Sequence, residues 1–543
     1  MTQLESQICC RLLLAHYGQI VAKVGTHLIR TGCQPLRLIA NDTETPIDQV
    51  KKALCVLIHH NFASYHVHKR GFVEYEVHHA PIIRILRYAR YIYSAKTLYG
   101  DTGELIIEEL LQNGKMTMSG AVKKVSDRLL ETMEDSKTRE YSETSSTFIR
   151  LVQTHFLQKC GIVSESVTAE GAHPSPAPTL VADEAEMYTV PTLGVTGQGK
   201  RRRTSGEGCE PKSKRSKQEH AEQELAPDDG IYWQVNFERF HQHFRDQVIV
   251  AAVGSKLDQT CSEIVRTMLR MSEVTTSSSS SHTQPLSSNE IFRAIPAGYN
   301  LSKQVLDQYL TLLSDDPIEF VGKSGDSGGG MYVINLHRAL ASLARATVES
   351  VVQERFGSRS ARIFRLLLRK RHLEQKQVED FAMIPAKEAK EMMYQMLSDN
   401  YMSLQEIPKT PDHAPSRTFY LYTVNLLPTA RMILQRCYKT VVNLIDRREY
   451  ETRENKRLLE KSQRIEAIMA SMQATGAEEQ QLQEIEEMIT APEQQQLETL
   501  KHNVNMLDSS ENQVDETIFI LESYINSTRI EKEVPNKRGG GGV

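Results

Sequence analysis

The chain lacks the long apolar runs that a membrane helix needs. No window of its 543 residues approaches roughly 18 consecutive apolar side chains, and the N-terminus has no hydrophobic signal segment. Its eight cysteines are scattered without a C-x-x-C pair, which argues against a disulfide framework or a zinc knuckle. We therefore expect a soluble intracellular protein with reduced thiols.

Strong charge of one sign and abundant aromatic side chains are also absent. The formal net charge is −4, so any contact with nucleic acid has to come from local basic patches. Aromatic residues make up 6% of the chain, with a single tryptophan, which argues against a stacking platform for single strands as the dominant design. The length predicts roughly three to five domains of ordinary size.

No catalytic, nucleotide-binding or metal-binding motif stands out either. Gly322-Lys323-Ser324 mimics the end of a phosphate-binding loop, but Pro317 occupies the place of the required glycine. Residues 325–329 spell the nucleophile loop of a serine protease without a credible base. The histidines between His59 and His79 have no cysteine or carboxylate at ligand spacing. We expect no catalytic residue, no cofactor and no metal.

What the chain does contain is a repeated unit of one helix followed by a two-stranded ribbon. In residues 45–79, Val50, Leu54 and Leu57 fall on one helical face. An alternating pattern then predicts two strands joined by a turn at residues 69–71. A helix that leads into such a ribbon is typical of the end of a winged helix-turn-helix domain.

Ungapped comparison finds this unit again at residues 301 and 385, and more weakly at 142. Two amphipathic helices can be aligned by chance, but the ribbon that follows the copies at 301 and 385 makes chance a poor explanation. The register aligns Val50 with Val305 and Ala389, Leu57 with Leu312 and Met396, and Asn61 with Asp316 and Asn400; in the weak copy Leu54, Leu57, Ile58 and Asn61 align with Phe148, Leu151, Val152 and His155.

The sequence therefore predicts a mainly α-helical protein with small β-wings. Four tandem winged-helix domains are expected to precede a C-terminal coiled-coil hairpin. The hairpin is predicted because apolar residues occupy heptad positions between Leu497 and Ile525, interrupted by Glu511. An intermolecular coiled coil is the alternative to the hairpin. The expected winged helices span 1–80, 81–160, 231–336 and 337–426, with a disordered basic insertion at 161–230, the hairpin at 427–530 and a disordered tail at 531–543.

The insertion carries two short basic clusters spaced like a bipartite nuclear import signal. Its richness in proline, serine, glycine and charge predicts an unstructured segment, and the alternative interpretation is a solvated charge run. The candidate import residues are Lys200, Arg201, Arg202, Arg203, Lys212, Lys214 and Arg215.

Basic side chains on the predicted outward faces are the candidates for DNA contact, since duplex affinity comes mostly from neutralised phosphates. The helix copy at 301 is short of positive charge, so we expect it to face a protein partner through Leu306 and Leu310. A solvated face is the alternative for each basic group. The candidate DNA-backbone contacts are Lys51, Lys52, Lys69, Arg70, Arg362, Arg365, Arg369, Lys370 and Arg371, and Arg84, Arg87 and Arg90 form a smaller basic stripe.

Long and unusual strings such as KKALCVLIHHN, DTGELIIEELL, EFVGKSGDSGGGMYVINLH and IPKTPDHAPSRTFYLYTVN run through nearly the whole chain. Through these strings the sequence resembles the family of third subunits of eukaryotic DNA-directed RNA polymerase III, which is related to the alpha subunit of transcription factor IIE. The resemblance implies a noncatalytic subunit of a three-subunit initiation subcomplex. It implies docking beside the polymerase clamp through the C-terminal hairpin, and help in engaging and opening promoter DNA.

The resemblance also implies partners and a location. The partners are the two other members of the initiation heterotrimer, the clamp of the largest subunit and promoter DNA, with no membrane and no small-molecule substrate. The location is the nucleus, and also the cytosol if the subunit takes part in sensing foreign DNA there. The alternative is a free-standing winged-helix regulator that dimerises through its heptads.

Overall fold

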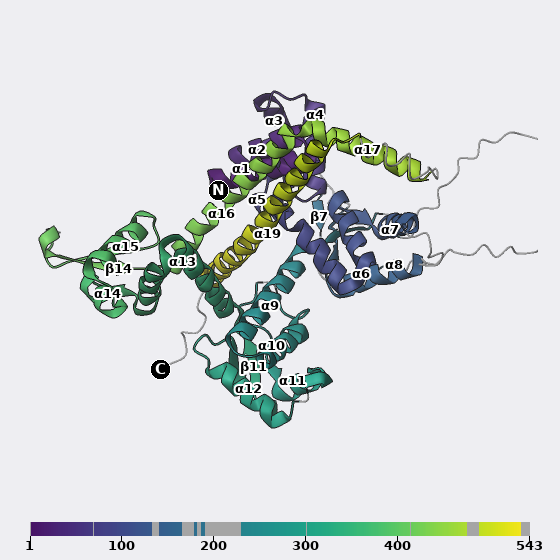
Figure 1. The fold of residues 1–543 in the computed structure, drawn as a ribbon. Coiled ribbons are helices and arrows are strands. Elements are labelled where there is room, and N and C mark those ends of the chain that lie inside the picture. The colour runs from purple at the N-terminus through teal and green to yellow at the C-terminus, as the bar shows by residue number, and fades with distance from the viewer. Residues whose placement is uncertain are drawn as a thin grey trace, which may run out of the picture. The chain divides into compact units, whose positions relative to one another are not determined.

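The computed structural model describes residues 2–68, 70–132, 141–164, 179–181, 186–190, 228, 230–277, 279–299, 301–412, 414–474 and 488–533. Helices dominate, and the strands form small antiparallel sheets, which confirms the predicted fold class (Figure 1). The chain divides into a first unit (1–30, 79–87 and 241–543) and a second unit (31–78 and 88–240). None of the helices in the described ranges combines the length and hydropathy needed to span a bilayer.

Four three-stranded sheets share one topology, in which the last strand of each lies between the other two. In each sheet, a short strand before a pair of helices and a longer strand after that pair both bond to the central strand, as in a winged helix. In the second unit the sheets are β1 (Gln34–Pro35), β3 (Val73–Val77) and β2 (Ala63–Val67), then β4 (Met116–Thr117), β8 (Tyr232–Val235) and β5 (Leu157–Lys159). In the first unit they are β9 (Leu286–Ser287), β11 (Met331–Ile334) and β10 (Val321–Gly325), then β12 (His372–Leu373), β14 (Thr418–Thr423) and β13 (Ser403–Pro408).

The second winged helix closes its sheet with a strand that lies beyond the insertion. Tyr232–Val235 pairs with Leu157–Lys159 on one side and with Met116–Thr117 on the other. The sequence-based expectation for the third domain is 231–336, and the first helix after this strand, α9, begins at Phe237 and runs to Lys256. We propose that the second domain continues to Val235, because its central strand cannot belong to another core.

Both units also contain helices. The second unit holds α3 (Leu36–Asp42), α4 (Ile47–His59), α6 (Tyr88–Asn113), α7 (Met118–Thr132), α8 (Tyr141–Gln153) and the ribbon β6 (Ile162–Ser164) with β7 (Thr179–Val181). The first unit holds α1 (Gln3–Tyr17), most of α2 (Gln19–Thr31), α5 (His79–Ile83), η1 (Arg84–Arg87), most of α9, α10 (Gln259–Ser272), α11 (Ser288–Ala294), η2 (Ala297–Tyr299), α12 (Lys303–Asp315), η3 (Ser327–Gly329), α13 (Leu336–Lys370), α14 (Gln375–Ala382), α15 (Ala386–Ser398) and η4 (Pro415–Arg417).

Three of the four helix copies end in the same turn. Asn61, His155 and Asn400 adopt positive φ angles of 58°, 65° and 64°, a left-handed conformation that terminates a helix. In each copy the next residue donates its N–H to a carbonyl of the last helical turn, as Phe62 does to Leu57 at 2.8 Å. The predicted register of α4, α8 and α15 is thereby confirmed.

The register predicted for α12 is wrong by one residue. Ser302 caps this helix in the place that Pro46 has before α4, so Val50 corresponds to Leu306 and not to Val305. Leu306 and Leu310 are fully buried in the core of the third domain, whereas Leu312 is 51% exposed. The expectation that Leu306 and Leu310 present a face to a protein partner is therefore wrong.

The C-terminal segment folds as an antiparallel helical hairpin, as predicted. Its helices α16 (Leu426–Glu454) and α19 (Ala491–Glu533) lie side by side, and α17 (Lys456–Ala474) continues from the end of α16 (Figure 1). Tyr438 donates a 2.6 Å hydrogen bond to Glu522, and Lys461 pairs with Glu493 at 2.7 Å. The paired residues thus come closer together in sequence along the hairpin, which is the pattern of an antiparallel pair. Glu511, which interrupts the heptads, accepts a 2.7 Å hydrogen bond from Arg448 and thus has a partner within the hairpin.

Candidate nucleic-acid interface

The largest group of predicted DNA contacts lies on the second half of α13, in the fourth winged helix. Gly357 interrupts the helix with φ 85° and ψ 171°, so the residues after it form a separate helical segment that reaches Lys370. Ile363, Phe364 and Leu367 on this segment are fully buried. The amphipathic pattern therefore places the basic side chains of the same segment in solvent: Arg362, Arg365, Arg369, Lys370 and Arg371 are all exposed.

Two of these five arginines and lysines already have structural roles. Arg365 donates a 2.8 Å hydrogen bond to Glu349, which lies on the other side of the Gly357 break. Arg362 donates at 3.2 Å to the carbonyl of Ala382, at the end of α14. Both contacts hold the fourth domain together, so these side chains are the weaker candidates for phosphate contact.

The other three lie together where α13 ends. Arg369 and Lys370 occupy the last helical turn, where positive charge is favoured by the helix dipole. Arg371 follows with a positive φ of 70° and donates its backbone N–H to Leu367 at 2.8 Å, which terminates the helix. Three successive exposed cations at this corner form the densest positive charge among the predicted contacts.

Exposed aromatic rings accompany lysines on the fourth domain, a feature that sequence composition did not indicate. The Nζ atoms of Lys370, Lys390 and Lys409 lie 5.8, 5.8 and 4.2 Å from ring centroids, distances at which a cation interacts with a π face. The rings are those of Phe381, Tyr394 and Phe419, which are 57%, 49% and 42% exposed.

Such pairs offer a charge for a phosphate beside a flat face for a base. The low total of aromatic residues concealed this local concentration. The one available signal was the strand TFYLYT, in which rings fall on both faces of the wing; Phe419 sits opposite Ile407 in the β13–β14 register.

The first winged helix presents fewer cations. Lys51 and Lys52 are exposed on α4, and Lys51 pairs with Asp48 at 3.6 Å between exposed side chains. Arg70 is exposed at the tip of the β2–β3 ribbon. Lys69 lies outside the described residues, as do all seven candidate import residues from Lys200 to Arg215.

The smaller arginine stripe does not form one exposed surface. Arg87 is 2% exposed, and its guanidinium donates to Asp515 at 2.9 Å and to Glu522 at 2.7 Å. It also lies over the ring of Phe519, 5.3 Å from the centroid. Arg87 is thus a buried link to the C-terminal hairpin and not a DNA contact.

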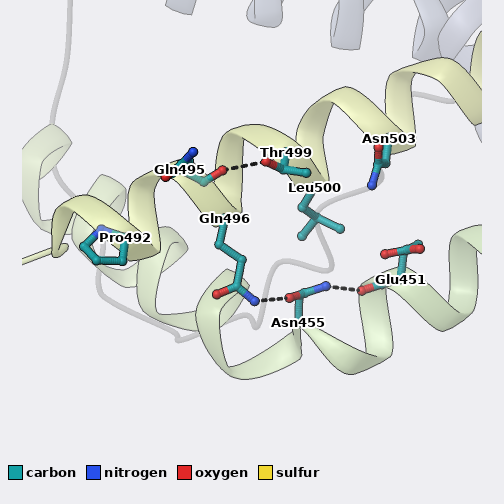
Figure 2. A pocket seen from close by; sticks show the side chains of 8 residues that line it. All are labelled: Glu451, Asn455, Pro492, Gln495, Gln496, Thr499, Leu500 and Asn503. Carbon is teal, nitrogen blue, oxygen red and sulfur yellow. Dashed lines mark hydrogen bonds between the residues drawn. The ribbon is translucent and has the colours of Figure 1, made fainter.

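A hollow of about 400 Å³ opens on the hairpin, where α16 ends and α17 begins (Figure 2). Gln496 reaches from α19 toward Asn455, and the amide groups share a 2.9 Å hydrogen bond. Asn455 in turn donates to the carbonyl of Glu451 at 2.9 Å. The eight residues that line the hollow include one carboxylate and no basic side chain, so the hollow does not suit a phosphate. The hollow lies beside the junction of α16 and α17.

Comparison with known proteins follows the domain plan. The family described as RNA polymerase III subunit RPC82 matches residues 146–343, and its helix-turn-helix domain matches 7–68. A family described as the POLR3C C-terminal winged-helix domain matches 348–424, and the helical hairpin domain of DNA-directed RNA polymerase III subunit RPC3 matches 457–520.

The similarity to whole proteins is equally extensive. The chain is 72% identical to DNA-directed RNA polymerase III subunit RPC3 of Homo sapiens, over 97% of this chain and 99% of that protein. Identity to the protein of the same name from Danio rerio is 64%, with the same coverage. A more distant relative from Dictyostelium discoideum is 28% identical over 44% of this chain and 38% of its own.

The fold defines a tandem winged-helix protein with a C-terminal helical hairpin. Within that class, the chain belongs to the family of DNA-directed RNA polymerase III subunit RPC3. It is therefore a subunit of a nuclear RNA polymerase, and the other subunits of that enzyme are its partners.

Proposed function

We propose that the chain is a noncatalytic member of a three-subunit initiation subcomplex of RNA polymerase III. In this role it helps the enzyme engage and open promoter DNA for small transcripts such as transfer RNA and 5S ribosomal RNA. Nucleotidyl transfer then belongs to the large subunits. The same DNA-facing surface would serve the enzyme in sensing foreign DNA in the cytosol.

The observation that carries this proposal is the closed C-terminal hairpin. Leu497, Leu500, Ile518 and Leu521, four of the heptad residues, are at most 5% exposed within a single chain. A free-standing regulator would need this seam for a second copy, but the chain buries it against itself. The hairpin is therefore suited to dock as a preformed rod, and we propose the polymerase clamp as its docking site.

The fourth and first winged helices are the proposed DNA-facing domains. Support comes from the cations at Arg369, Lys370 and Arg371, from the exposed lysine–aromatic pairs, and from Lys51, Lys52 and Arg70. The third domain has the opposite character, because on it Asp316 neutralises Lys256 at 2.6 Å and Asp326 lies beside Lys323. We propose that the third domain contacts protein.

The decisive experiment is crosslinking of promoter DNA in the assembled polymerase. The test variant combines Arg369→Ala, Lys370→Ala and Arg371→Ala, and the control combines Lys303→Ala and Lys323→Ala, two exposed cations of the third domain. We expect the test variant to lose fourth-domain adducts. Its DNA affinity should also depend less on salt: the slope of log binding constant against log salt concentration should become shallower by roughly 0.9 for each lost phosphate contact. The control should match the parent.

Two outcomes would contradict the proposal. Adducts that map to α12 and the third-domain wing, with none on the fourth or first domain, would reverse the domain assignment. Recovery of the full-length chain as a homodimer, without stoichiometric polymerase subunits, would favour the free-standing regulator.

A further inference from the structure

Four metal-binding side chains gather on the sheet of the first winged helix. Cys33 immediately precedes β1, His66 lies on β2, and Glu74 and Glu76 lie on β3. The register places His66 opposite Glu74, and Pro35 opposite Glu74 on the other side. Since alternate residues of a strand share a face, Glu74 and Glu76 project in the same direction. The pairing of three strands therefore collects donors that are far apart in sequence.

The spacing of the donor atoms matches the edges of a tetrahedral zinc site. With bonds of about 2.0 to 2.3 Å, a tetrahedral zinc ion places its ligand atoms about 3.3 to 3.8 Å apart. Cys33 Sγ lies 3.5 Å from His66 Nε2, and that same Nε2 lies 3.3 Å from Glu74 Oε2. Ligand atoms of these three residues all lie within 4.8 Å of one another.

A fourth side chain lies beside these three. Glu76 Oε2 lies 3.8 Å from Cys33 Sγ, where it accepts a hydrogen bond from the thiol. Within the described part of the chain, the one ion-pair partner of Glu74 is His66, and Glu76 has no lysine or arginine partner. Two carboxylates beside a thiol and an imidazole form a pocket of negative charge that a divalent cation would neutralise.

We propose that Cys33, His66 and Glu74 bind one zinc ion, and that Glu76 supports the site from beside the Cys33 thiol. Sulfur, imidazole nitrogen and carboxylate oxygen together suit zinc better than magnesium or calcium, which prefer oxygen alone. The ion links the segment before β1 to both strands of the ribbon. It therefore fixes the outer part of the β2–β3 ribbon, one residue pair from the turn that carries Arg70.

Spacing in the sequence could not show this site. The expectation that no cysteine or carboxylate accompanies the wing histidines considered near neighbours only, whereas Cys33 precedes His66 by 33 positions. Only the antiparallel pairing of β1, β2 and β3 brings the donors together. Glu74 is 17% exposed and His66 49% exposed, so an ion reaches the site from solvent without opening the fold.

The test uses the purified full-length chain and the metal alone. Bound zinc is measured by mass spectrometry after gel filtration, and zinc is then replaced by cobalt, whose thiolate charge-transfer band reports a sulfur ligand. Cys33→Ser and Glu74→Gln remove proposed ligands. Cys55→Ser removes an exposed thiol from α4 and serves as the matched control.

We expect one zinc ion per chain in the parent and in Cys55→Ser, and none retained by Cys33→Ser. Glu76→Gln should weaken cobalt binding by about 10- to 100-fold, the usual effect of losing a group that supports a metal site. Zinc should raise the thermal midpoint of the parent and of Cys55→Ser, but not that of Cys33→Ser or Glu74→Gln. Unchanged far-ultraviolet circular dichroism shows that the variants fold.

Three results would overturn the proposal. The parent chain retains no zinc at micromolar concentration, or Cys33→Ser retains as much zinc as the parent, or the cobalt charge-transfer band disappears in Cys55→Ser and persists in Cys33→Ser. The second and third results would assign the metal to other histidines or thiols of the chain.

Discussion

Arg87 donates a 2.9 Å hydrogen bond to the carboxylate of Asp515, although 428 positions separate the two residues in sequence. Arg87 is 2% exposed and Asp515 is fully buried, and Tyr438 completes the cluster by donating to Glu522. A buried charge of this kind is tolerated only with its partners in place. The contact therefore ties the short η1 helix near residue 87 to the C-terminal hairpin.

Removal of this arginine should loosen the hairpin. Arg87→Met leaves Asp515 buried without its cation, so we expect a loss of about 3 to 5 kcal/mol in the free energy of unfolding. Chemical denaturation measures the loss, and hydrogen exchange should show it first in α19. Lys456→Met is the control, because Lys456 is 71% exposed and its pair with Glu460 spans 3.8 Å at the surface. Equal stability of the two variants would show that the cluster contributes little.

The strand beyond the insertion provides a second prediction. Trp233 is fully buried, with its ring 5.7 Å from that of Phe148 in a T-shaped arrangement. Trp233→Ala should cost about 3 to 5 kcal/mol and speed amide exchange in α8 but not in α10. Ile264→Ala, within α10, should have the reverse pattern. Faster exchange in α10 for Trp233→Ala would instead assign this strand to the third domain.

The corrected register of α12 leads to a third prediction. Leu306→Ala creates a cavity in the third-domain core and should cost about 2 to 5 kcal/mol, which thermal unfolding would measure. Leu312→Ala alters an exposed side chain and should stay within about 0.5 kcal/mol of the parent. Leu306→Ala with parental stability but weakened subunit association would restore the partner-face interpretation.

A pH dependence follows from His60 in the second unit. Burial lowers the pKa of His60 from 6.5 to about 4, and the charges of His59 and Lys115 contribute in the same direction. Below pH 6.5 the unfolded chain binds a proton that the folded form accepts only near pH 4. The contribution of His60 to the free energy of unfolding is therefore constant above pH 6.5. It falls as the pH decreases from 6.5 to about 4, by up to about 3 kcal/mol.

Urea unfolding of His60→Gln between pH 4 and 7 would measure this effect. The fluorescence of Trp233, the single tryptophan, reports on the same unit. We expect a shallower decline with acid than in the parent, whereas His502→Gln, an exposed histidine of α19, should leave the decline unchanged. A parental slope in His60→Gln would remove His60 as the cause.

Local periodicity predicted the helices well where a recognisable boundary accompanied it. Pro46 and Pro385 each precede a helix with apolar residues at the same spacing, so the registers of α4 and α15 followed from sequence. At α12 the cap is Ser302, and the ungapped comparison placed the start one residue early. One residue of helix is about 100° of rotation, which is enough to turn a core leucine into an apparent surface leucine.

Contacts between distant segments could not be predicted in the same way. Arg87 has the spacing of a surface arginine, and it is buried because the folded chain packs Asp515 against it. The residues Tyr232–Val235 satisfy both an alternating and a helical pattern, and tertiary pairing decides between them. The proposed metal ligands illustrate the same limit, because strand pairing and not sequence spacing brings Cys33 to His66.

The late central strand of the second winged helix has a consequence for synthesis. After β5 leaves the ribosome, roughly 70 residues have to be added before β8 exists, which takes about 4 to 14 s at roughly 5 to 20 residues per second. During that interval Phe148 lacks the ring of Trp233 that covers it in the folded protein. The nascent chain thus exposes an incomplete core for seconds, a period in which a chaperone could bind it, while the first winged helix, whose strands are close in sequence, is already able to close its sheet.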